Sequence, residues 1–116
     1  MSRDSVVADK SRKFAYRIVD LYKYLTTVKQ EFVMSKQILR SGTSIAANIA
    51  EGECAESKAD FFHKLNIALK ETNETMLWLD LLRYGSYISD GEFQSVNNDC
   101  TEIIKILTAI TKQQKK

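Results

Sequence analysis

The sequence contains no proline, and its only glycines are at positions 42, 52, 85 and 91. Sheet proteins need turns about every 8–12 residues, and such turns favour Gly, Pro and Asn. The long stretches without these residues argue against an all-β fold and favour helices. No window approaches the roughly 20 apolar residues that span a bilayer. Residues 1–14 also lack the apolar stretch of a signal peptide, so we expect a cytoplasmic location.

Residues that carry catalytic or metal-binding chemistry are scarce. His63 is the only histidine, and Cys54 and Cys100 are the only cysteines, which we expect to be reduced thiols. Asp60 and His63 have the spacing of one ligand element of a di-iron bundle, but such a site needs that element on two helices. The cysteines lack the paired spacing of structural zinc sites. We therefore expect no enzyme, no metal and no cofactor.

Apolar residues recur at helical spacing in four blocks, which cover residues 8–30, 35–54, 57–85 and 89–113 approximately. The expected core residues are Phe14, Ile18, Leu21, Leu25, Ile38, Ile45, Ile49, Phe62, Leu65, Leu69, Met76, Leu79, Val96, Cys100, Ile103, Leu107 and Ile110. The short connections force neighbouring helices to be antiparallel. The expected fold is a single all-α domain over residues 1–116, an up-down-up-down four-helix bundle.

Three serines are placed to cap these helices at their N-termini. Ser11 is a candidate for the first helix, and Ser57 precedes the third with Asp60 three residues on. Ser89 and Glu92 match the capping-box pattern S-x-x-E at the start of the fourth.

Positive charge is concentrated at the two ends of the chain, and the middle is acidic, although the net charge is only +2. An up-down-up-down bundle brings both termini to one end, which predicts a basic cap there. The candidate nucleic-acid contacts are Lys10, Arg12, Lys13, Arg17, Arg40, Lys112, Lys115 and Lys116. The alternative is a solvated surface without a ligand.

The third helical block has more apolar residues than one core stripe requires. Ile67, Trp78 and Leu81 lie off that stripe, so they form either a second face that contacts another subunit or the edge of one wide core. We favour the second face and expect a homo-oligomer. In the second block, Asn48 has small apolar neighbours and must find hydrogen bonds, for example on a facing helix. Glu51 is expected to pair with a basic residue on another element or subunit, for example Arg40.

The run QILRSGTSIAANIAEG at residues 37–52 resembles the signature of the four-helix-bundle family encoded in intervening sequences of bacterial 23S ribosomal RNA. The resemblance continues through Phe61-Phe62, Glu74 and the turn at residues 85–88. It implies an antiparallel bundle that forms a homopentamer. It also marks Ser44, Asn48, Glu51 and Gly52 as structural or interface positions, beside Trp78. A related branch, the accessory variability proteins of diversity-generating retroelements, binds nucleic acid and a reverse transcriptase.

These observations leave two functions open. One is a non-enzymatic homo-oligomeric scaffold, expected to be a pentamer, that binds RNA or an RNA–protein partner. The alternative is a protein-interaction scaffold without a nucleic-acid role, which would use the acidic segment from Glu51 to Asp60 as its working face.

Overall fold

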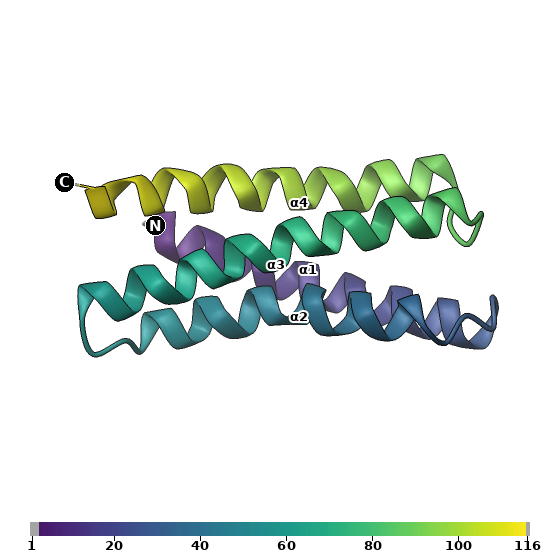
Figure 1. Cartoon of the computed structure of the whole chain (residues 1–116), viewed down its shortest axis with the longest axis horizontal. Helices are drawn as coiled ribbons and strands as arrows, with labels where there is room; N and C mark the ends of the chain where they lie inside the picture. Colours follow the sequence, from purple (N-terminus) through teal and green to yellow (C-terminus); the bar gives the residue numbers. More distant parts are fainter. Residues whose placement is uncertain (1–2, 116) are drawn as a thin grey trace.

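The structure is a computed structural model that describes the backbone of residues 3–115 and the side chains of residues 6–114. Its elements are α1 (Arg3–Thr27), α2 (Met34–Glu53), α3 (Lys58–Tyr84), α4 (Asp90–Thr111) and a short 3-10 turn, η1 (Lys112–Lys115). Each helix runs antiparallel to the next, and both termini lie at the same end of the bundle (Figure 1). The expected all-α bundle is confirmed.

Two of the three expected serine caps are present. The Ser57 hydroxyl accepts a hydrogen bond from the Asp60 amide at 3.1 Å. Ser89 and Glu92 form a complete capping box. Ser11 was wrong as a cap, because α1 already begins at Arg3 and Ser11 is buried within the helix, where its hydroxyl donates to the Ala8 carbonyl.

The start of α2 is capped by a residue that the sequence pattern did not reveal. Val33 is the N-cap position and makes no side-chain cap. Instead the buried Glu31 carboxylate accepts hydrogen bonds from the amides of Val33 (3.2 Å), Met34 (3.0 Å) and Ser35 (2.6 Å). Burial alone would raise the pKa of Glu31, but these amide bonds outweigh it and lower the pKa below its usual range. An ionised carboxylate thus satisfies the first free amides of α2.

The core follows the expected stripes on α2 and α4, and differs on α3. Leu65, Ala68, Leu79 and Leu82 are buried on α3, whereas Phe62, Leu69 and Met76 are only half-buried. Two threonines complete the buried stripe with spacings of three and four residues, Thr72 and Thr75. Their hydroxyls donate to carbonyls one turn earlier, at 2.8 Å each, so a polar side chain is accommodated in the core.

Two glycines let α2 approach its neighbours closely. A Cβ atom on Gly42 would lie 2.8 Å from Cγ1 of Ile18 on α1, and one on Gly52 would lie 2.8 Å from Cδ1 of Leu65 on α3. Both distances are shorter than real Cβ contacts. Glycine at these two positions therefore has a structural role, because a side chain there would push α2 away from α1 or α3.

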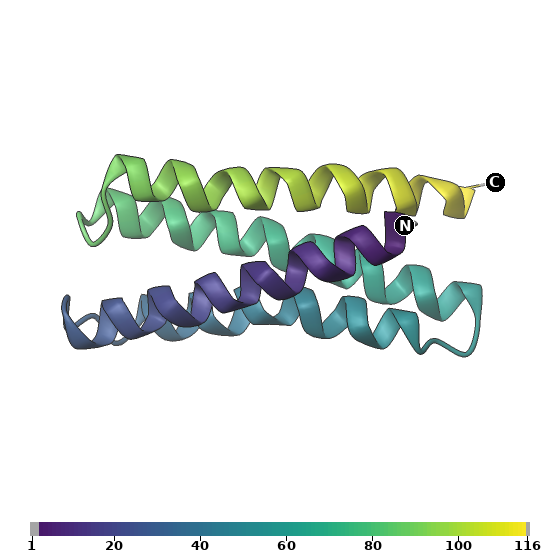
Figure 2. The same ribbon diagram turned by 180° about the vertical axis from the view of Figure 1, so that it is seen from behind.

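The bundle is 46 Å long and about half as wide. α1 lies near α4 at the end that holds the termini and diverges from it toward the α1–α2 turn (Figures 1 and 2). Of the four pairs of adjacent helices, α1 and α4 make the least extensive contact. Among the described helices, none combines the length and apolar content needed to cross a membrane.

Candidate interaction surfaces

An apolar stripe on α3 faces away from the core. Leu77, Leu81 and Tyr84 have exposed fractions of 53%, 36% and 87% and are spaced i, i+4, i+7, so they share one face of the helix. We call these three residues the α3 stripe. The sequence pattern identified only Leu81 of the three, although the same spacing could have revealed Leu77 and Tyr84.

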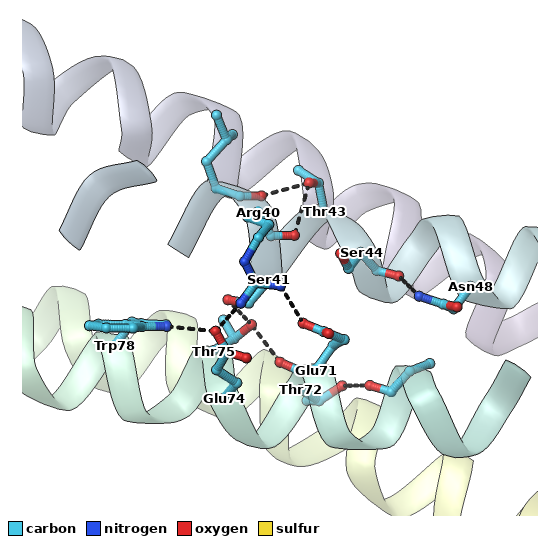
Figure 3. A network of polar contacts seen from close by, with 12 residues as sticks. Arg40, Ser41, Thr43, Ser44, Asn48, Glu71, Thr72, Glu74, Thr75 and Trp78 are labelled. Atoms are coloured by element: carbon cyan, nitrogen blue, oxygen red, sulfur yellow. Dashed lines mark hydrogen bonds and ion pairs between the residues drawn. The ribbon is translucent and has the colours of Figure 1, made fainter. Parts of the chain in front are cut away.

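Trp78, expected on this outer face, is half-buried instead. Its indole Nε1 donates to Glu74 Oε2 at 2.9 Å, and Glu74 also pairs with Arg40 of α2 (Figure 3). Arg40 reaches Glu71 as well, at 3.3 Å. The hydrogen bond from Trp78 and the ion pair with Arg40 lower the pKa of Glu74, and the bond to Glu74 raises the pKa of Arg40. This network joins α2 to α3 and fixes the ring beside the α3 stripe.

Most candidate nucleic-acid contacts on α1 are already paired with carboxylates. Lys10 pairs with Glu102 of α4 at 2.8 Å, and Lys13 with Asp9 of α1 at 3.1 Å. Arg17 pairs with Asp99 of α4 at 2.7 Å. The basic end of the chain therefore faces acids on α4, which the sequence could not place opposite it. The expected basic cap is partly neutralised.

The remaining candidates differ in their surroundings. Arg12 and Lys112 are exposed and have no ion pair among the described residues. Arg40 is held by α3 as described above. Lys116 and the Lys115 side chain lie outside the described residues.

The other chemistry-bearing residues are dispersed. Within the described part of the chain, no group of three or more His, Cys, Asp or Glu side chains could hold a metal ion. His63 is exposed. Cys54 is exposed, whereas Cys100 is buried, and burial together with the nearby Asp99 raises its pKa to about 12.

The model of the 23S rRNA-intervening sequence protein family matches residues 3–109 of this chain. The chain belongs to this family. A similar solved structure is the crystal structure of a protein of unknown function from the S23 ribosomal protein family of Bacteroides thetaiotaomicron. The two sequences are 61% identical, and the match covers 96% of this chain and 99% of the Bacteroides chain, with a TM-score of 0.95. Neither description names a catalytic activity. Among curated proteins there is no match.

Two family-signature residues of α2, Asn48 and Glu51, both have polar partners. The Asn48 amide donates to the Ser44 carbonyl within α2 at 2.8 Å, and not to a facing helix (Figure 3). Glu51 pairs with Lys64 of α3 at 3.0 Å, and not with Arg40. Asn48 therefore has a hydrogen-bond partner, and Glu51 pairs with a basic residue of another helix as expected, with Lys64 in place of Arg40. Helical periodicity gives a residue's face but not which neighbouring side chain lies nearest. In this family member the signature mainly fastens α2 to α3.

Proposed function

We propose that this member of the intervening-sequence family is a non-enzymatic scaffold that assembles as a homo-oligomer, expected to be a pentamer. The observation that carries the proposal is the α3 stripe. A four-helix bundle buries one apolar stripe per helix, and α3 carries a second one on its outer side. Contiguous exposed apolar side chains on one face mark an interaction site.

The location of charge favours protein contacts over RNA contacts for this scaffold. RNA binding draws its affinity from cations that are free to meet phosphates. Lys10, Lys13 and Arg17 would first have to leave their carboxylate partners. The scaffold is therefore best suited to present its surfaces to a protein partner.

Binding of RNA or an RNA–protein partner is the second candidate, and the location of the termini supports it. Arg12 and Lys112 are exposed cations near the end where α1 begins and α4 finishes. Neither residue has an ion-pair partner among the described residues, so both are available to phosphates.

Light scattering after size exclusion tests the assembly. The wild-type chain is expected to give several times 13.3 kDa. Leu81→Glu places a charge in the α3 stripe without disturbing the core, because Leu81 is already exposed. We expect that variant to run as a single chain. Thr101→Glu, at an exposed site on α4, is the matched control and should keep the wild-type mass. A single-chain wild-type particle would refute the proposal.

Filter binding with a structured RNA separates the two candidate functions. If RNA binds, affinity should fall steeply with salt, and Arg12→Gln with Lys112→Gln should reduce the salt slope by about two, one for each phosphate that is no longer neutralised. Lys36→Gln, an exposed lysine on α2 at the far end of the bundle, is the control. No binding at low salt would remove the RNA candidate and leave the protein scaffold.

A further inference from the structure

A groove opens between α1 and α4 at the end of the bundle remote from the termini. Its volume is about 470 Å³, which lies within the range of about 300–1,000 Å³ that accommodates ligands of drug size. Leu21, Ile88 and Val96 supply apolar walls, and the carboxylates of Asp20 and Glu92 lie at its rim. The α3 stripe is a separate surface, because α3 packs against α2 and α4 and contributes no residue to the groove.

The divergence of α1 from α4 creates the groove. Along α1 from its N-terminus, Arg17 is the last described residue whose side chain is hydrogen-bonded to α4. It donates to the Asp99 carboxylate at 2.7 Å and to the Ser95 hydroxyl at 2.9 Å. Toward its C-terminal end, α1 runs alongside α2 and away from α4 (Figure 2). Apolar side chains that would otherwise meet across the helix pair therefore line an open space.

The α3 stripe has the residue spacing of a helix that binds in an apolar groove. Helices that dock into apolar grooves use anchors at i, i+4 and i+7, which is the spacing of Leu77, Leu81 and Tyr84. The unpaired charges also match, because Arg17 of the groove is paired with Asp99, and Asp80 beside the stripe is paired with Arg83. Lys70 extends the same face of α3 and is exposed without an ion pair among the described residues. The groove rim offers Asp20 and Glu92, which also have no cationic partner there.

We propose that the α3 stripe of one copy docks into the α1–α4 groove of the next copy. This inference rests on the proposed homo-oligomer and assigns its two contact surfaces. Since the surfaces are different, the contact is heterologous, and each copy keeps one surface free for the next. Such contacts close into a ring when the rotation between copies permits it, whereas a contact between two identical stripes would stop at a dimer.

The test needs one variant for each surface. Leu81→Glu places a charge in the middle of the α3 stripe. Gly91→Arg fills the groove, because Gly91 lines it and a Cβ there meets nothing nearer than the Ser89 hydroxyl at 3.9 Å. The added guanidinium would meet Asp20 and Glu92 and repel Lys70. Gly91→Ala is the matched control, and thermal melts should show that all three variants fold.

Native mass spectrometry of the separate and mixed variants then decides. Leu81→Glu and Gly91→Arg should each be single chains, and Gly91→Ala should keep the wild-type assembly. An equimolar mixture of the first two should form a particle with one copy of each, because the mixture restores one intact stripe and one intact groove.

Contrary results separate this inference from the proposed function. If wild type assembles and Gly91→Arg remains assembled, the groove takes some other occupant, such as a helix of a different protein, and the inference is overturned. If neither variant assembles and the mixture contains only single chains, the stripe and groove are not partners. If the wild type itself is a single chain, the proposed function fails first.

Discussion

Replacing Glu31 should measure how much one buried carboxylate contributes to the start of α2. In the native chain it accepts hydrogen bonds from three consecutive amides and lies 7% exposed. Loss of a capping side chain costs about 0.5–2 kcal/mol, and loss of a charge at a helix N-terminus about 0.3–1 kcal/mol. We therefore expect Glu31→Ala to lower the free energy of unfolding by about 1–3 kcal/mol. Glu31→Gln, which keeps an acceptor oxygen, should lower it by about 1 kcal/mol.

The effect should depend on pH in one direction. The folded-state pKa of Glu31 is lowered, so its contribution is present above the unfolded-state value of about 4.3 and is lost as pH falls through the folded pKa. The difference between wild type and Glu31→Gln should therefore be constant near neutral pH and shrink in acid.

Urea denaturation followed by circular dichroism measures these differences. Protein concentration must be fixed, because self-association would add to apparent stability. Glu53→Gln, at an exposed carboxylate near the other end of α2, serves as the control and should be within about 0.5 kcal/mol of wild type. Equal stability of wild type and Glu31→Ala, or a Glu31→Gln difference that does not change with pH, would contradict this account of the cap.

Two substitutions and one thiol titration test the packing. Gly42→Ala should destabilise the bundle by about 1–3 kcal/mol in the same denaturation assay, because the new methyl overlaps Ile18; a neutral result would show that the helices can separate freely. Thiol titration should label Cys54 readily and Cys100 only after unfolding, since Cys100 is buried with a pKa raised to about 12; equal labelling rates would refute its burial. Thr75→Val should lower the free energy of unfolding by about 1–3 kcal/mol, because it leaves the buried Ser41 hydroxyl of α2 without its hydrogen-bond partner. Unchanged stability would show that this hydrogen bond is dispensable.

The polar interior of α3 shows where sequence reasoning reached its limit. Counting only apolar residues placed Leu69 and Met76 in the core stripe and passed over Thr72 and Thr75. Threonine reads as polar, yet its hydroxyl can bond to its own helix and leave its methyl for packing. The regular three- and four-residue spacing of the buried positions contained the signal, but only a helix seated against its neighbours shows which face is inward.

The candidate surfaces show the same limit in terms of charge. The sequence revealed that the chain ends are basic and the middle acidic. It did not reveal that Lys10 and Arg17 lie opposite Glu102 and Asp99, because ion pairs between α1 and α4 join residues about 80–90 positions apart. The α1–α4 groove was equally hidden, since it depends on the angle between two helices.

By itself, the sequence determined what local chemistry controls: four helices, two of their caps, the core stripes of α2 and α4, and the family signature. Helical periodicity and capping act within a few residues, so they can be read along the chain. Only the tertiary structure decided which charges neutralise one another, which apolar residues of α3 remain outside, and where the bundle opens. Those features arise from the relative placement of whole helices, which is set by the packing of all four together.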